Sequence, residues 1–140
     1  MIVLDTNVIS ETMRRVPNEA VVGWLDSQPA NDLYLCTPVL GELCYGIARL
    51  KDSSRKTALL SSYSELVMRA FGERILPFDV PAAEAYGDLV AKLQNAGRSI
   101  DVFDAMIAAI AQSYSATLAT RNTDHFRHAG VALFNPFGEA

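Results

Sequence analysis

The feature that most constrains the fold is a short apolar run near the start of the chain that ends on a carboxylate. Residues 2–4 (Ile-Val-Leu) precede Asp5 and carry no polar side chain, which is typical of a strand buried on both faces of a parallel sheet. Further strand patterns lie at residues 32–36, 74–78 and 116–120, with another within 131–138, and helical patterns fill the intervals. This alternation predicts an α/β fold with a mostly parallel central sheet and helices on both faces.

The helical segments are bounded by recognisable capping residues. Thr37 and Pro38 predict a helix start, because threonine can cap a helix and proline suits its first position. Gly72 and Gly97 are expected to end two other helices, since glycine readily adopts the left-handed backbone found there. The predicted helices cover residues 8–15, 19–27, 39–50, 56–72, 80–97 and 101–115.

Length and composition favour one domain that spans residues 1–140. Half of the residues are hydrophobic and 20% are charged, so the chain is neither disordered nor fibrous. No apolar run is long enough to cross a bilayer, and Asp5 interrupts the first one, so we expect a cytoplasmic protein without a membrane partner. The formal net charge of −4 argues against binding of nucleic acid by a large basic field, but it allows a nuclease whose acids hold metal cations.

The cysteines and histidines form no zinc motif. Cys36 and Cys44 lie among apolar neighbours without a partner at metal-ligand spacing, and both are expected to be buried, reduced thiols. His125 and His128 also lack the spacing of a zinc pair, and we expect them on the surface of a loop.

Two carboxylates each have a functional and a structural interpretation. Asp5 stands at the carboxyl end of a parallel strand, where open sheets of this kind bind ligands. However, Asp5, Thr6 or Asn7 could instead cap the helix that follows. Glu42 lies on the flank of its predicted helix with open space beside it at Gly46, although an exposed glutamate on a helix edge is the simpler interpretation.

Asp101 and Asp104 begin an apolar, alanine-rich helix, where negative charge interacts favourably with the positive end of the helix dipole. A cap and its third-position partner would account for one of them comfortably. Because Asp104 leads directly into the buried face of the helix, we assign Asp101 to the cap and Asp104 to a functional site. Polar side chains also follow the strand at 116–120, so strand ends and helix starts both present oxygen atoms of the kind that Mg²⁺ prefers.

The ordered set of these motifs resembles the PIN domain and, more narrowly, the VapC and FitB-like toxins of bacterial toxin–antitoxin pairs. The stretches "LDTNVIS", "TPVLGELCYG", "DAMIAAIA" and "LATRN" occur in the order and spacing of that family. The likeness to FitB-like proteins extends to "PNEAVVGWLDS", "RILPFD" and the terminal "FNP", and it covers essentially the whole chain. Each motif is moderately specific, whereas the ordered set is highly specific.

The resemblance implies a PIN-like fold and an endoribonuclease that depends on Mg²⁺ or Mn²⁺. In this likeness, Asp5, Glu42 and Asp104 match three catalytic, metal-binding acids. Asn122 falls at the fourth acidic position of FitB-like proteins, so the fourth ligand is Asn122, the nearby Asp124 or a water molecule. The small polar positions that support the family's site are matched by Thr6, Asn7 and Thr120.

The same resemblance implies the toxic component of a type II toxin–antitoxin system. Its expected partners are an RNA substrate, a cognate antitoxin from the adjacent gene, and a second copy in a homodimer. The homodimer is expected to use the helix "DAMIAAIAQ" or the tail "FNPF". Apolar positions that could receive the antitoxin are Trp24, Leu40, Tyr45, Ile47, Leu59 and Leu60.

Other function classes fit parts of the sequence. An aspartyl-phosphate phosphatase usually has a second aspartate two residues after the first, where this chain has Asn7. A phospho-accepting receiver domain needs an acidic pair at its first strand, which is missing. A PIN-like module that binds RNA or a partner without cleavage is favoured by Asn122 and opposed by the three acids. Metal-dependent cleavage separates these alternatives.

Overall fold

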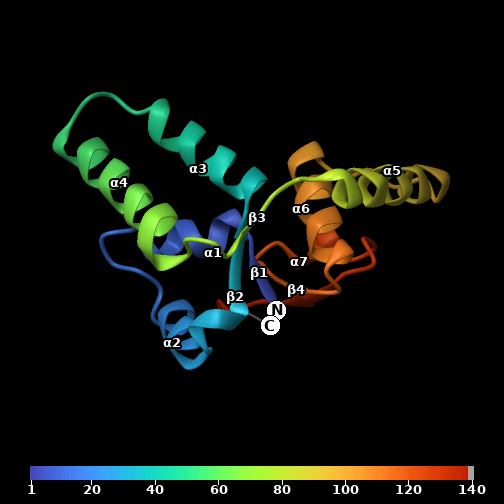
Figure 1. Ribbon diagram of the computed structural model, residues 1–140, viewed down its shortest axis with the longest axis horizontal. Helices are drawn as coiled ribbons and strands as arrows, with labels where there is room; N and C mark the ends of the chain where they lie inside the picture. Colours follow the sequence, from blue (N-terminus) through green and yellow to red (C-terminus); the bar gives the residue numbers. More distant parts are fainter. Residues whose placement is uncertain (139–140) are drawn as a thin grey trace.

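A five-stranded parallel sheet forms the centre of the computed structural model, which describes residues 1–138 (Figure 1). All of its strand pairings are parallel, and β1 lies between β2 and β4. The predicted α/β fold with a parallel sheet is therefore confirmed. In the spatial order of the sheet, the strands are β3 (Ile75–Leu76), β2 (Leu33–Cys36), β1 (Ile2–Leu4), β4 (Thr117–Ala119) and β5 (Ala132–Phe134).

Helices connect the strands, and α2 lies on the opposite side of the sheet from α5 and α6 (Figure 1). Within the described residues, no helix is long and apolar enough to span a membrane. The α-helices are α1 (Thr6–Thr12), α2 (Glu19–Ser27), α3 (Thr37–Ala48), α4 (Ser54–Glu65), α5 (Val80–Asn95), α6 (Val102–Ser113) and α7 (Thr123–Phe126). A 3-10 turn, η1 (Ala30–Asp32), precedes β2, and a π-helical segment, η2 (Leu66–Ala70), follows α4.

The strands are buried as their apolar runs predict. Val3, Leu4 and Leu118 are fully buried in the core, which accounts for the absence of polar alternation in β1 and β4. Helix α6 is also buried within this chain beyond its first turn, since Ile107 and Ile110 have no exposed surface. The buried centre of the "DAMIAAIAQ" helix offers little surface to a second copy, whereas Met106 is half-buried and Gln112 is exposed, so the use of this helix in a homodimer stays a prediction.

Several local predictions are wrong in detail. Cys36, not Thr37, is the N-cap of α3, and the Thr37 hydroxyl instead accepts a hydrogen bond from the Phe78 N–H at 3.1 Å. Cys36 is buried as predicted, and burial raises its pKa to about 12. Cys44 is exposed, because it lies on the outer side of α3, away from the residues that pack on the sheet.

The predicted helix at 56–72 is instead α4 followed by η2, and it begins earlier because the Ser53 hydroxyl caps the Lys56 N–H at 3.1 Å. The strand predicted within residues 131–138 is confirmed as β5. Helix α7 occupies a segment in which the sequence indicated only polar loop residues.

Candidate metal centre

Residues from the ends of two adjacent strands meet at the carboxyl edge of the sheet. Asp5 follows β1, and Thr120 follows β4, the strand that pairs with β1. Both residues are buried, with exposed fractions of 3% and 0%. The Thr120 hydroxyl donates a hydrogen bond to Asp5 Oδ2 at 2.7 Å. Parallel pairing thus brings together two residues that are 115 positions apart in the sequence.

Asp5 caps α1 and also contributes a buried carboxylate to this edge. The Thr6 N–H donates to Asp5 Oδ1 at 2.7 Å, and Asn7 Nδ2 donates to Asp5 Oδ2 at 3.2 Å. Burial raises the pKa of Asp5, while the hydrogen bonds from Thr120, Thr6 and Asn7 oppose that rise. The two interpretations of Asp5 are therefore compatible, because the cap contact fixes the carboxylate in place.

Asn7 joins the two strand ends through its side-chain amide. Its Oδ1 accepts a hydrogen bond from the Arg121 N–H at 3.1 Å, just beyond β4, while its Nδ2 contacts Asp5. The oxygen and the nitrogen of the amide are thus both hydrogen-bonded, and together they hold the backbone after β4 against the start of α1. Thr120 and Asn7 are placed to support Asp5, as the resemblance implied.

Glu42 reaches the same region from α3, which begins where β2 ends. The Thr6 hydroxyl donates a hydrogen bond to Glu42 Oε1 at 2.6 Å, so the first turn of α1 orients this carboxylate. Burial raises the pKa of Glu42, and the negative charges of Asp5 and Asp101 raise it further. Glu42 is thus half-buried beside other acids, and the interpretation as an exposed edge glutamate does not hold.

Asp101 and Asp104 take different places at the start of α6. Asp101 is the N-cap, and its Oδ2 accepts a hydrogen bond from the Phe103 N–H at 3.1 Å, as predicted. The Asp104 side chain is 19% exposed, and its Oδ2 lies 3.5 Å from His125 Nδ1. Burial raises the pKa of Asp104 to about 6, with further contributions from the charges of Asp5 and Asp101.

These different places predict opposite effects of substitution on stability. Asp101→Ala removes a helix cap and is expected to lower the free energy of unfolding by about 0.5–2 kcal/mol. Asp104→Asn removes a carboxylate that other acids repel, and it is expected to leave this free energy unchanged or raised. Urea unfolding of the metal-free variants measures both effects. Loss of stability only in Asp104→Asn would mean that the two roles are reversed.

Asn122 and Asp124 differ in their relation to these acids. The Asn122 N–H donates to the Thr120 hydroxyl at 3.0 Å, and Asn122 lines the same pocket as Asp104. Asp124 forms an ion pair with Arg127 and lines a neighbouring pocket. Of the two side chains predicted as a fourth ligand, only Asn122 shares a pocket with one of the three acids.

The acids influence one another electrostatically without forming a closed cage. In residues 1–138, no three His, Cys, Asp or Glu side chains are gathered closely enough to hold a metal ion directly. The donor set still fits a hard divalent cation such as Mg²⁺, which prefers carboxylate oxygen and keeps several of its waters. A cation among these acids would offset the repulsion that raises the pKa values of Asp104 and Glu42.

His125 is the residue that the sequence did not place at this centre. It was expected on a loop surface unrelated to the acids, yet it contacts Asp104 and lines the pocket beside it. The sequence signal that could have indicated the contact with Asp104 is the position of His125 shortly after Thr120. Polar residues that follow a parallel strand gather at the same edge of the sheet.

The chain is similar to known proteins over nearly its whole length. The model of the PIN domain family matches residues 2–131. Toxin FitB of Neisseria gonorrhoeae is 44% identical over 137 residues, which cover 98% of this chain and 99% of that protein. A VapC ribonuclease of Sinorhizobium fredii is 39% identical over 140 residues, which cover 100% of both chains. The crystal structure of FitAcB from Neisseria gonorrhoeae superimposes with a TM-score of 0.92 at 43% identity, covering 99% of this chain and 100% of that one.

Proposed function

This chain belongs to the PIN-domain family, as its ordered motifs predicted, and on that premise we propose that it is an endoribonuclease dependent on Mg²⁺ or Mn²⁺. We further propose that it is the toxin of a type II toxin–antitoxin system, since relatives that match it over nearly their whole length are named a toxin and a ribonuclease. The observation that carries the proposal is the electrostatic proximity of three acids at one edge of the sheet: besides burial, the charge of Asp5 raises the pKa values of both Glu42 and Asp104.

In the proposed centre, the three acids hold the cation and the neighbouring polar residues orient the acids. Asp5, Glu42 and Asp104 would hold the cation, which when bound lowers the pKa of a water molecule and offsets charge on the phosphate. Thr120 and Asn7 keep Asp5 oriented, and Thr6 does the same for Glu42. Attack of water on phosphorus in line with the P–O3′ bond breaks that bond. The products are a 5′-phosphate and a 3′-hydroxyl.

A cleavage assay tests this function. The purified protein is expected to cut RNA in millimolar Mg²⁺ or Mn²⁺, and mapping of the new 5′ ends should reveal monophosphates. A protein that binds RNA but leaves it intact under these conditions would favour the alternative, a PIN-like module with weak or no catalysis. The feature that supports this alternative is Asn122 at the fourth position, where FitB-like proteins carry an acid.

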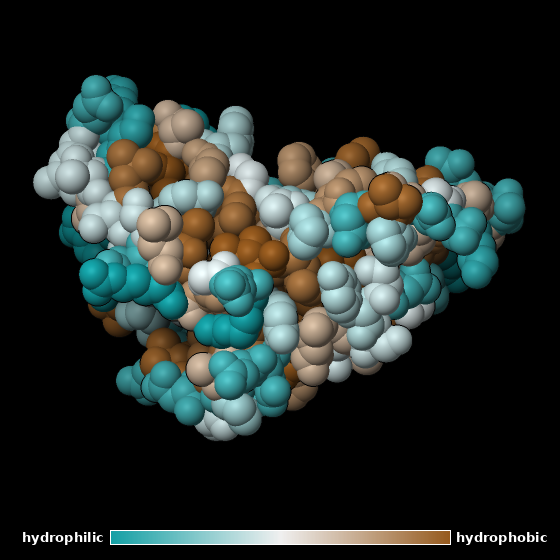
Figure 2. Space-filling view, in the orientation of Figure 1, coloured by the Kyte–Doolittle hydropathy of each residue, from teal (hydrophilic) through white to brown (hydrophobic). Residues whose placement is uncertain are grey.

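An apolar groove between α1, α3 and α4 is the proposed antitoxin site. A pocket of about 240 Å³ in this groove is lined by Met13, Leu43, Ile47 and Leu59, with Glu42 at its edge. Figure 2 shows hydrophobic residues gathered over the α3–α4 region of the molecule. Trp24 does not belong to this groove, because its ring stacks on Phe134 with centroids 5.2 Å apart.

Inhibition by the product of the adjacent gene is the expected test of this partner. An apolar segment of that protein should fill the groove, and a basic side chain at its end would pair with the acids and exclude cation or substrate. Co-purification followed by the cleavage assay measures both effects. If the product fails to bind, or binds without slowing cleavage, the toxin–antitoxin assignment is wrong even when the nuclease assignment stands.

We propose the first turn of α6 and the adjoining face of α3 as the homodimer contact. Phe103 and Tyr45 are 42% and 70% exposed there, and a Cβ at Gly41 would lie 3.9 Å from the Phe103 ring. Exposed aromatic side chains on adjoining helices are typical of association surfaces. In the tail, Phe137 is buried but Phe134 is 44% exposed, so the tail stays the second candidate for this contact.

A further inference from the structure

A pocket of about 390 Å³ opens beside Asp104, and it extends beyond the proposed metal centre to residues that have no role in the proposed reaction. Apart from Asp104, its lining comes from the end of the α5–α6 connection and from the turn between β4 and α7. Its volume is in the range of pockets that hold small organic ligands. The other lining residues are Ser99, Ile100, Asp101, Asn122 and His125.

Two walls of the pocket suit a flat, aromatic group. The His125 side chain is 59% exposed, and its contact with Asp104 uses a ring nitrogen, which leaves the faces of the imidazole ring unused by that contact. Ile100 contributes half-buried aliphatic surface. Nucleobases of unpaired RNA stack on histidine and other planar side chains in this way, whereas a phosphate gains nothing from an apolar or aromatic face.

The polar groups of the pocket suit the edge of a base. Asn122 does not cap α7 with its side chain, and its amide can both donate and accept hydrogen bonds. Asp101 accepts its cap hydrogen bond with Oδ2, and carboxylates also accept from the exocyclic amino groups of bases. The negative charge of Asp101, which is not among the acids proposed to hold the cation, disfavours a phosphate group in this pocket. The lining therefore selects a base rather than the backbone.

We propose that this pocket is a nucleobase subsite, in which His125 stacks on a base and Asn122 and Asp101 contact its edge. Because Asp104 belongs to both the pocket and the proposed metal centre, the base is that of a nucleotide adjoining the scissile phosphate. The carboxylate acceptor favours bases with an exocyclic amino group, namely adenine, cytosine and guanine, over uracil. This proposal rests on the proposed ribonuclease function.

Cleavage of RNA oligonucleotides that differ only in the nucleotides flanking the cut tests the subsite. The wild-type protein is expected to disfavour uracil at one flanking position. His125→Ala should raise KM about 10-fold for the preferred bases, in line with the usual cost of losing one base stack, and should flatten the preference at that position only. His125→Phe retains a stacking ring and is expected to restore most of the lost affinity.

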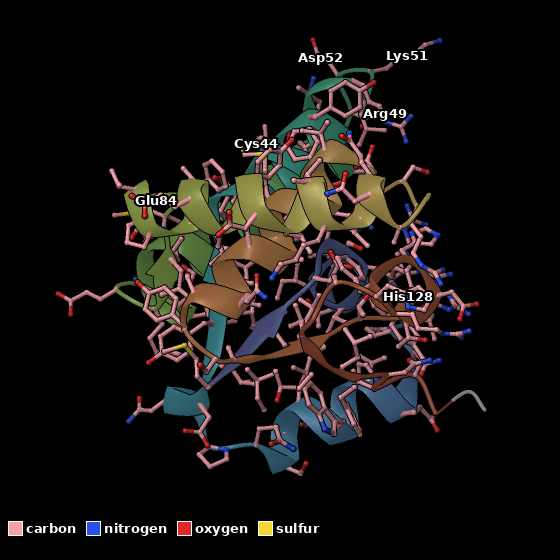
Figure 3. All side chains as sticks on the ribbon, turned by 90° about the vertical axis from the view of Figure 1, so that its right-hand side faces the viewer. Cys44, Arg49, Lys51, Asp52, Glu84 and His128 are labelled. Atoms are coloured by element: carbon pink, nitrogen blue, oxygen red, sulfur yellow. The ribbon has the colours of Figure 1, made fainter. Side chains whose placement is uncertain are left out.

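His128→Ala is the matched control, because His128 is exposed just after α7 (Figure 3) and lies outside this pocket. It should keep the wild-type KM and base preference. The proposal is overturned if His125→Ala keeps them as well. If the wild-type protein cuts no RNA, the proposed function fails separately, and binding of the same oligonucleotides in EDTA decides the subsite. Equal binding by wild type and His125→Ala would then reject it.

Discussion

Asp5→Asn, Glu42→Gln and Asp104→Asn are each expected to lower the rate of RNA cleavage at least about 100-fold, with the fold intact. Each substitution removes one negative oxygen ligand from the proposed centre while keeping the size of the side chain. Single-turnover cleavage rates measure the loss, and circular dichroism verifies the fold. Asp26→Asn, which changes an exposed carboxylate on α2, is the matched control and should retain full activity.

The fold should survive these substitutions because the acids destabilise the metal-free protein. Burial raises the pKa values of Asp5, Glu42 and Asp104, and repulsion by neighbouring acids raises those of Glu42 and Asp104 further, so the ionised forms are less favourable in the folded state than in the unfolded chain. Neutral amides remove that cost at pH 7. Full cleavage activity in purified Asp104→Asn would refute the assignment of this residue to the centre.

Millimolar Mg²⁺ or Mn²⁺ is expected to raise the melting temperature by about 5–10 °C at pH 7–8, through preferential binding to the folded state. EDTA should abolish both this shift and RNA cleavage. The expected shift depends on pH, because the pKa of Asp104 is raised from its ordinary value of 3.8 to about 6. Below pH 6, Asp104 is mostly protonated in the folded protein and competes poorly for a cation. The metal-induced shift should therefore fade between pH 6 and pH 4.

The metal-free protein should show the opposite trend. A carboxyl group whose pKa is raised by folding binds its proton more tightly in the folded state, so stability falls as pH rises from about 4 to about 6. Asp104→Asn should flatten this slope. Melting curves at a series of pH values, with and without Mg²⁺, measure both trends. The metal hypothesis fails if neither ion shifts the wild-type melting curve and cleavage continues in EDTA.

The fold was predictable because each strand can be recognised from its own short run of apolar residues. Apolar runs as short as Ile2–Leu4 are sufficient when both faces of a parallel strand are buried. The sequence also predicted that Asp101, and not Asp104, is the N-cap of α6, because a cap is determined by residues within one helical turn. Local chemistry thus accounts for the parts of the molecule that the sequence predicted well.

Apart from errors at helix ends, what the sequence did not predict concerns contacts between distant segments. The Thr6–Glu42 hydrogen bond spans 36 residues, and the His125–Asp104 contact depends on how α7 packs against α6. The exposure of Cys44 and the stacking of Trp24 on Phe134 likewise depend on which helix covers which surface. Periodicity identifies the apolar face of a helix, but it does not identify the partner of that face.

The order of the strands in the sheet has a consequence for a toxin made by the cell that it can harm. Strand β4 is synthesised late but lies directly beside β1, and Thr120, which holds Asp5, follows β4. While the chain is still emerging from the ribosome, β1 lacks this neighbour, and the Asp5 carboxylate lacks its hydroxyl donor. Asp104 also leaves the ribosome only after about three quarters of the chain has been made. On the proposed function, we therefore expect the complete centre to form only when synthesis is nearly finished, so that an antitoxin would meet an active toxin only after the chain is complete.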